Sequence, residues 1–255
     1  MSDHFILTPF FLDRPEKGLN VLREADWQIN KPALPVGSPQ ERMVYLYRPL
    51  AAMVATAVRQ GQRPVSIAGD CCASLGVLAG LEQVGVRPTL IWFDAHGDFN
   101  TWQTTPSGFL GGMPLAMAVG RGEQTIVQGI GLTPLPETQV ILTDARDLDA
   151  AEREALAASG VVHLPHVTDL LAYPLLDGPL YVHFDTDVLT PADAPAMNYL
   201  AAGGPTAVEL AQLFRYLAGT GRVTAVSMSS WNPSMDNDGR SRRAAMALLH
   251  DLLYL

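Results

Sequence analysis

Short apolar runs alternate along this chain with longer segments whose apolar residues recur at helical spacing. Strands are expected over residues 5–11, 64–68, 89–94, 139–143, 161–163, 180–185 and 223–228. Helices are expected over residues 43–60, 73–81, 114–119, 150–159, 206–217 and 240–253, with a further helix starting in 19–25. Thr206, followed by Glu209, has the spacing of a capping box. This alternation predicts one α/β domain over residues 1–255, with a mainly parallel sheet between two helix layers (three layers, α-β-α).

Polar residues follow one of these apolar runs, in the segment Thr-Leu-Ile-Trp-Phe-Asp-Ala-His-Gly-Asp-Phe-Asn at 89–100. Side chains alternate between the faces of a strand, so Asp94, His96 and Asp98 are expected on one face at its carboxyl end. Ligands of open α/β sheets bind at that edge. Carboxylates packed together need a positive partner, for which a divalent cation is suited. The alternative is a solvated, Asp-rich turn at a strand end.

A second run repeats the pattern in Leu-Tyr-Val-His-Phe-Asp-Thr-Asp-Val-Leu-Thr-Pro at 180–191. Asp185 and Asp187 end this strand, and His183 lies two residues earlier on the same face. Two strands that deliver four carboxylates and an imidazole predict a site for two divalent metal ions. Two such ions can hold a bridging hydroxide, the nucleophile of many hydrolases.

Composition limits the classes of partner. A net charge of −9 argues against nucleic acid, and there is no apolar run long enough to span a membrane. The N-terminal residues lack a signal-peptide pattern, and the two cysteines, Cys71 and Cys72, are adjacent, which excludes a disulfide framework. We therefore expect a cytoplasmic protein with a small-molecule substrate.

Taken in order, these segments resemble the arginase/agmatinase (ureohydrolase) family from about residue 64 to 252. The family's Gly-Gly-Asp-His-Ser turn corresponds to residues 68–72 and its Asp-Ala-His-x-Asp-x-Asn motif to 94–100. Its Ser-Gly-Asn-Leu-His-Gly loop corresponds to 107–112, its second aspartate motif to 183–191 and its Glu-x-Asn-Pro segment to 230–233. The resemblance implies the arginase-like fold, two divalent ions, with manganese the usual metal, and assembly as a homo-oligomer.

The resemblance also implies a ligand set. Asp94 and Asp185 would bridge both ions, Cys71 and Asp98 would complete one of them, and His96 and Asp187 would complete the other. Cysteine replaces histidine at position 71, and a thiolate there would favour zinc, cobalt or iron. The alternative for Cys71 is a small buried apolar residue.

The remaining departures concern the substrate. The family's loop histidine is Gly111 here, its guanidinium-binding glutamate is Ser230, and a threonine that supports that glutamate is Tyr199. Tyr199 and Trp231 are expected to form an aromatic wall for a flatter or less charged group, or else to pack in the core. Asn100 and Ser107 match positions that hold the amino-acid end of arginase substrates.

We therefore expect a binuclear-metal hydrolase that cleaves a C–N bond of a guanidino, amidino or related amino-acid-like small molecule through a metal-bridging hydroxide. Asp98 would stabilise the tetrahedral intermediate. His183, which replaces a small serine of the family, would carry the proton in place of the absent loop histidine, or would orient a carboxylate or pack in the core. The alternative function is a non-catalytic binding or scaffold homologue that has lost these groups.

Overall fold

The computed structural model describes residues 1–254, and its centre is an eight-stranded sheet in which every pair of neighbouring strands is parallel. The strand order is β4-β1-β5-β10-β9-β6-β7-β8. The strands are β1 (Ser2–Thr8), β4 (Gln28–Ile29), β5 (Gln62–Ala68), β6 (Thr89–His96), β7 (Val140–Asp147), β8 (Val162–Leu164), β9 (Leu180–Asp185) and β10 (Val223–Ser229), and a separate hairpin joins β2 (Phe10–Phe11) to β3 (Arg14–Pro15).

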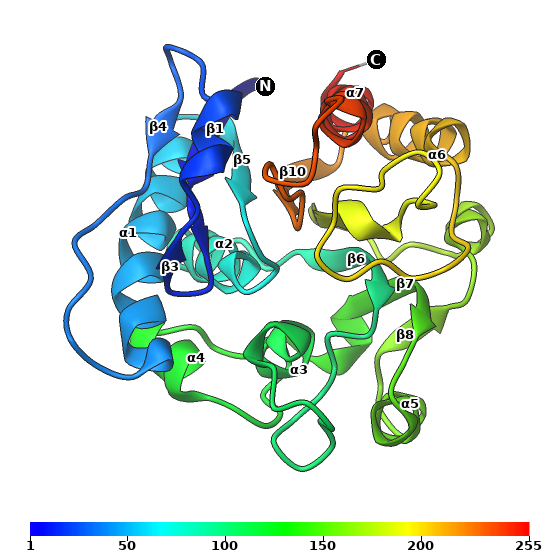
Figure 1. Ribbon diagram of the computed structural model, residues 1–255, viewed down its shortest axis with the longest axis horizontal. Helices are drawn as coiled ribbons and strands as arrows, with labels where there is room; N and C mark the ends of the chain where they lie inside the picture. Colours follow the sequence, from blue (N-terminus) through cyan, green and yellow to red (C-terminus); the bar gives the residue numbers. More distant parts are fainter. Residues whose placement is uncertain (255) are drawn as a thin grey trace.

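Helices cover both faces of the sheet, which confirms the predicted three-layer fold (Figure 1). One layer contains α1 (Pro39–Arg59), α2 (Ala73–Glu82), α3 (Pro114–Ala118) and α4 (Thr125–Ile130), and the other contains α6 (Ala207–Gly219) and α7 (Arg240–Leu253), while α5 (Ala150–Ala157) lies near β8. Five 3-10 turns complete the described elements: η1 (Lys17–Leu22), η2 (Leu110–Gly112), η3 (Glu137–Gln139), η4 (Val167–Leu171) and η5 (Thr186–Val188).

Alternation along the strands divides the core into two layers. Trp92 and Tyr181 face α1 to α4, whereas Phe93 and Phe184 face α6 and α7. Phe214 of α6 packs edge-on against both phenylalanines, with ring centroids 5.1 Å apart in each pair. This aromatic packing fixes the two acidic strands, β6 and β9, against one helix.

Most predicted elements are confirmed. The capping box at Thr206 forms, with its hydroxyl accepting from the backbone N–H of Glu209. Residues 17–22 form a 3-10 turn rather than the start of an α-helix, and α4 was not predicted from the sequence. The short α4 ends at Gly131 in the left-handed conformation (φ 73°), so its stop signal was present but its six residues gave little periodicity.

No helix within residues 1–254 combines the length and the apolar character needed to cross a bilayer.

Glycine at position 80 allows α2 to pack against α1. A Cβ atom there would lie 2.5 Å from the carbonyl oxygen of Ala51 and 2.6 Å from Cβ of Val54. Gly80→Ala should gain about 1 kcal/mol of helix propensity but lose more through this backbone clash, for a net destabilisation of about 1–3 kcal/mol in denaturant unfolding.

The matched variant is Gly76→Ala in the same helix, because its nearest neighbour is a side-chain methyl of Leu50 at 2.9 Å that can move. It should cost clearly less than Gly80→Ala. Equal costs would contradict a role for the Ala51 carbonyl.

Candidate metal centre and substrate cavity

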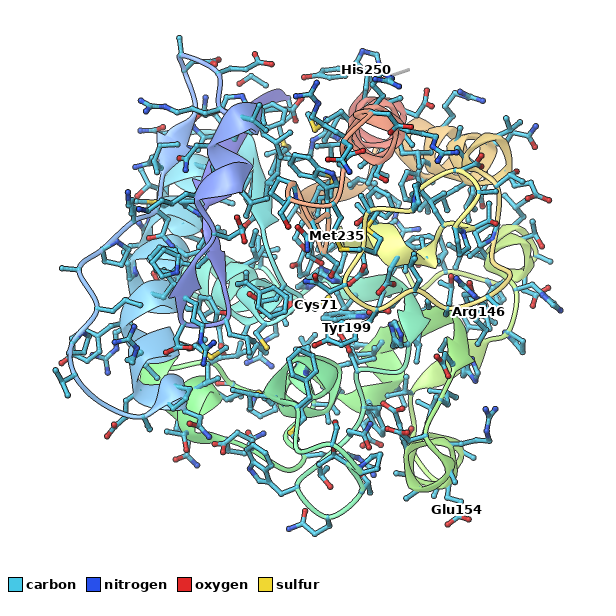
Figure 2. All side chains as sticks on the ribbon, viewed as in Figure 1. Cys71, Arg146, Glu154, Tyr199, Met235 and His250 are labelled. Carbon is cyan, nitrogen blue, oxygen red and sulfur yellow. The ribbon has the colours of Figure 1, made fainter. Side chains whose placement is uncertain are left out.

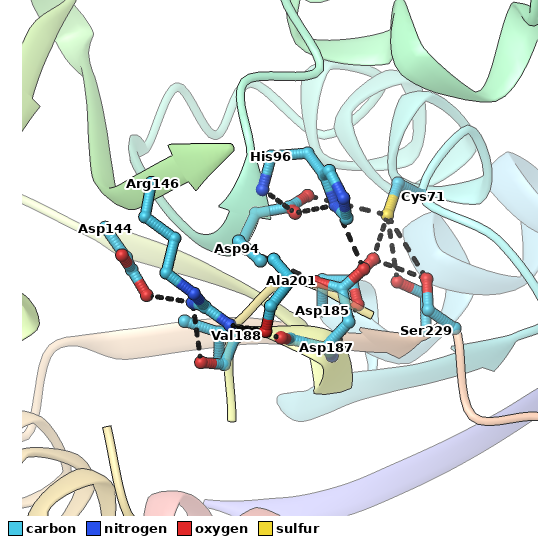
Figure 3. Close-up of polar contacts among 12 residues, drawn as sticks. Cys71, Asp94, His96, Asp144, Arg146, Asp185, Asp187, Val188, Ala201 and Ser229 are labelled. Atoms are coloured by element: carbon cyan, nitrogen blue, oxygen red, sulfur yellow. Dashed lines mark hydrogen bonds and ion pairs between the residues drawn. The ribbon is translucent and has the colours of Figure 1, made fainter. Parts of the chain in front are cut away.

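Four adjacent strands, β5, β10, β9 and β6, carry polar residues at their carboxyl ends, and these residues meet at one point of the sheet edge (Figure 3). The turn after β5 supplies a cysteine, β6 and the residues after it supply two aspartates and a histidine, and β9 with η5 supplies two aspartates. The structure therefore brings together all the predicted metal ligands: Cys71, Asp94, His96, Asp98, Asp185 and Asp187.

The first group of donors surrounds the cysteine. One ligand atom from each of Cys71, Asp94 and Asp98 lies within 4.8 Å of the others. The sulfur of Cys71 is also 2.7 Å from Oδ2 of Asp185 and 3.9 Å from Oδ2 of Asp94. This is the grouping that the resemblance implied for one of the two ions.

The second group surrounds the histidine. Nδ1 of His96 is 3.4 Å from Oδ1 of Asp94 and 3.1 Å from Oδ2 of Asp187. Asp94 belongs to both groups, so its two oxygens can reach two neighbouring cations. The backbone N–H groups of Ala95 and His96 donate to Asp187 and Asp94 and hold these carboxylates in place.

When no cation is bound, the buried carboxylates of this cluster repel one another. Burial raises the pKa of Asp98 and Asp185 well above the ordinary range, and neighbouring carboxylates add to the shift. Burial also raises the pKa of the Cys71 thiol. Burial alone would lower the pKa of His96, but its hydrogen bonds to Asp187 and Asp94 raise it to about 12. Divalent cations would replace the protons that these groups otherwise retain.

Asp98 provides a direct test of whether a cation fits. Its Oδ2 atom is buried without a hydrogen-bond partner among residues 1–254. Its backbone lies in the left-handed region (φ 49°), and its carbonyl oxygen accepts from the N–H groups of Leu115 and Ala116 at the start of α3. An orphaned carboxylate oxygen on a strained, anchored backbone suits a metal ligand.

All of the donor cluster except Asp94 lines a cavity of about 380 Å³. Four of the predicted substrate residues line it: Asn100, Ser107, Tyr199 and Ser230. Figure 2 shows Tyr199 beside Cys71. The hydroxyl of Ser230, a residue with φ of 70°, donates a short hydrogen bond to Oδ2 of Asp185 and so lies at the edge of the donor cluster.

Trp231 does not join an aromatic wall at this cavity, and its position agrees with the alternative of a residue packed in the core. Its side chain is buried and does not line this cavity, because its indole N–H donates to Asp236 (2.8 Å) in the segment that precedes α7. Residue 231 follows the end of β10, where strand alternation no longer applies, so its direction could not be derived from spacing.

Two other residues complete the aromatic wall with Tyr199. The ring of Phe109 lies 5.1 Å from that of Tyr199 and 6.3 Å from that of Phe11. A Cβ atom at Gly111 would meet the Phe109 ring at 2.4 Å. The place of the missing loop side chain is therefore filled by an aromatic ring.

His183 lies behind the donor cluster rather than in the cavity. Its side chain is buried, Nδ1 is 2.7 Å from Oγ of Ser227, and its ring packs at a tilt against Trp92 with centroids 3.8 Å apart. Burial lowers its pKa to about 3. A neutral imidazole outside the cavity does not suit the predicted proton carrier, and the alternative of a histidine packed beside the carboxylates agrees better with this geometry.

Three further acidic residues of the cavity were missed: Asp147, Asp149 and Glu152. Asp147 ends β7 and the other two come soon after it, as the other aspartates lie at or just after the ends of β6 and β9, so the same signal of an acidic strand end was present in the sequence. The amide of Asn100 donates to Oδ2 of Asp149 (2.9 Å) and connects this acidic side to the predicted substrate residues.

Arg146 was also missed, and it fixes the segment after β9. Its guanidinium pairs with Asp144 and donates to the carbonyl oxygens of Val188 (3.0 Å), Asp187 (3.2 Å), Ala201 (3.2 Å) and Ala202 (3.0 Å) (Figure 3). One side chain thus holds both a candidate metal ligand, Asp187, and the loop that carries Tyr199.

Glu152 gives a pH-dependent prediction. Burial raises its pKa from 4.5 to about 7, so the folded state binds this proton more tightly than the unfolded state. Its contribution to stability is therefore most favourable below pH 4.5 and is lost as the pH rises through about 7. Glutamine does not titrate, so in metal-free protein the Glu152→Gln variant should not lose this stability as the pH rises. The free energy of unfolding of the variant minus that of wild type should therefore rise by about 3 kcal/mol across this window.

Denaturant unfolding at about pH 5 and about pH 8 measures the effect. Glu154→Gln is the control, because Glu154 is exposed on the same helix, α5 (Figure 2). A relative stability of Glu152→Gln that does not change with pH would contradict the shift.

Arg146→Lys retains the charge but removes the planar fork that reaches several carbonyls. We expect it to weaken manganese binding about 10-fold or more, measured by calorimetry, because the backbone of Asp187 loses its support. Arg63→Lys is the control. Arg63 pairs with Asp3 (2.6 Å) and donates to the carbonyl of Leu253 (2.7 Å) at the amino end of β5, away from the carboxyl ends of the strands where the donor cluster lies. Equal losses of manganese affinity in both variants would refute this role of Arg146.

Comparison with known proteins agrees with this geometry. The sequence model of the arginase family matches residues 11–254. The arginase of Bacillus caldovelox is 32% identical over 217 residues, covering 80% of this chain and 72% of that enzyme. The N(omega)-hydroxy-L-arginine amidinohydrolase of Streptomyces lavendulae is 30% identical over 212 residues, covering 78% of this chain and 75% of that enzyme. The crystal structure of Bacillus subtilis arginase superposes with a TM-score of 0.84 at 26% identity, covering 100% of this chain and 99% of that one. The chain therefore belongs to the arginase family, whose members are hydrolases of non-peptide C–N bonds.

Proposed function

We propose that this protein hydrolyses a C–N bond in a guanidino or amidino group of an amino-acid-like small molecule. The observation that carries the proposal is the convergence of six donor side chains, one of them with an orphaned carboxylate oxygen, of which five line a cavity large enough for such a molecule. Two divalent cations held there would supply a nucleophilic hydroxide at neutral pH.

The donor set divides between two cations. Asp94 and Asp185 would be shared, Cys71 and Asp98 would belong to one cation, and His96 and Asp187 would belong to the other. Manganese is the cation expected for an oxygen-rich set, and a thiolate would shift the preference towards zinc, cobalt or iron.

The far side of the cavity supports an amino-acid-like tail. Asn100 and Ser107 offer an amide and a hydroxyl to a carboxylate, while Asp147 and Asp149 offer carboxylates to an ammonium group. A zwitterionic end would thus meet both kinds of partner, and this recognition would place the opposite end over the donor cluster.

The reactive end of the cavity argues against ordinary arginine as the best substrate. The hydroxyl of Ser230 stands where a carboxylate would neutralise a guanidinium, and loss of such a partner costs about 2–5 kcal/mol. Phe109 and Tyr199 instead present aromatic faces to the cavity. These faces suit a planar group of lower charge, such as an N-hydroxyguanidine or a formimino group.

After metal loading, a substrate panel tests the function. It contains arginine, hydroxyarginine, agmatine, guanidino acids and formimino compounds, and it measures released urea, hydroxyurea or ammonia. We expect at least one substrate to be hydrolysed, with kcat/KM for the less charged group at least about 10-fold above that for arginine.

Asp98→Asn should lower kcat by about 100-fold or more, because Asp98 faces the reacting centre, whereas Asp177→Asn at an exposed loop should have no effect. If no substrate is turned over by protein that contains two metal ions, the rival function of a non-catalytic binding or scaffold homologue is favoured.

A further inference from the structure

The imidazole of His183 is held in one orientation within the core. Nδ1 is 2.7 Å from Oγ of Ser227, which is itself 2.6 Å from the hydroxyl of Tyr181. The ring face packs on Trp92, whose indole N–H donates to the metal-ligand candidate Asp94 (3.0 Å). The ring cannot turn without breaking these contacts.

The other ring nitrogen has no strong partner. Nε2 lies 3.5 Å from Oγ of Ser229, and that hydroxyl is 3.2 Å from the sulfur of Cys71. A ring nitrogen of His183, the sulfur of Cys71 and a carboxylate oxygen of Asp185 all lie within 4.8 Å of one another. A buried, fixed and weakly bonded nitrogen therefore faces a thiol and a carboxylate.

We propose that His183 is a metal ligand, and that Cys71, His183 and Asp185 form a site selective for zinc or cobalt. Ligand atoms around tetrahedral zinc are roughly 3.5 Å apart, given bonds of about 2.0–2.3 Å. The Cys71 sulfur and Oδ2 of Asp185, now 2.7 Å apart, would therefore separate slightly around the ion, and all three donor atoms already lie within 4.8 Å of one another. Sulfur and imidazole donors favour these ions over manganese, which prefers oxygen. The proposal deepens the proposed function, because Asp185 and Cys71 belong to the same centre.

The neighbours of His183 agree with ligation through Nε2. The hydroxyl oxygen of Ser227 has two lone pairs, so it can accept hydrogen bonds from both Tyr181 and Nδ1 of His183. With its proton on Nδ1, the ring directs the lone pair of Nε2 towards Cys71. Metal-bound histidines are generally oriented by such a hydrogen bond at their second nitrogen.

Cobalt spectroscopy tests the sulfur. Reduced protein freed of metal by a chelator is titrated with Co²⁺, and we expect a near-ultraviolet thiolate-to-cobalt charge-transfer band. Cys71→Ser should abolish this band. In competition experiments, His183→Gln should lower the preference for zinc over manganese at least about 10-fold, whereas the exposed His250→Gln should leave it unchanged.

X-ray absorption tests the imidazole without any change at His183. Among residues 1–254, His96 and His183 are the histidines of the candidate metal-binding groups, so cobalt-loaded His96→Gln protein leaves His183 as their one imidazole. We expect both sulfur and imidazole scattering around the cobalt. Sulfur without imidazole, or oxygen alone, would overturn the proposal.

The results also separate this proposal from the proposed function. Hydrolysis by protein whose metals carry neither sulfur nor the His183 imidazole overturns the new site alone. A cobalt centre with both donors but no turnover on the substrate panel supports the site and counts against the hydrolase. Far-ultraviolet circular dichroism of the metal-free variants verifies that each is folded.

Discussion

Repulsion among buried carboxylates is the constraint on which the rest of this structure depends. Asp94, Asp98, Asp185 and Asp187 are nearly inaccessible to solvent and lie within one corner of the sheet edge. Charges withdrawn from water must be neutralised by protons or by cations, since an unpaired buried charge is strongly destabilising. His96 neutralises part of the negative charge of these carboxylates. The charge that is left requires protons or bound cations, which explains why a fold with a large apolar core keeps this edge polar.

The protein holds the cluster with backbone groups as well as side chains. Main-chain N–H groups bind Asp94, Asp185 and Asp187, and Arg146 binds the carbonyl side of the same segment. Four of the non-glycine residues with positive φ within residues 1–254 lie at these strand ends, including Asp98. Such strained positions tend to occur at functional sites, where surrounding contacts maintain them.

Strand periodicity explains how much of the site could be predicted. Asp94 and Asp185 lie in strands, so alternation alone placed them on one face, and the parallel sheet brought their ends together. Trp231 and Phe109 lie in irregular segments, where spacing says nothing about direction, and their positions follow from tertiary packing. Arg146 could not be identified because most of its partners are carbonyl oxygens, which every residue possesses.

The contact between Phe109 and Gly111 bears on how this site can change during evolution. The backbone of Gly111 is not in the left-handed region, so the phenyl ring, rather than backbone conformation, excludes a larger residue. Any side chain at 111 is tolerated only after residue 109 has become smaller or has turned away. The two positions are therefore epistatic, because a side chain at 111 requires either a displaced ring or a smaller residue at 109. A library of single substitutions at 111 would miss every variant that needs the smaller residue at 109.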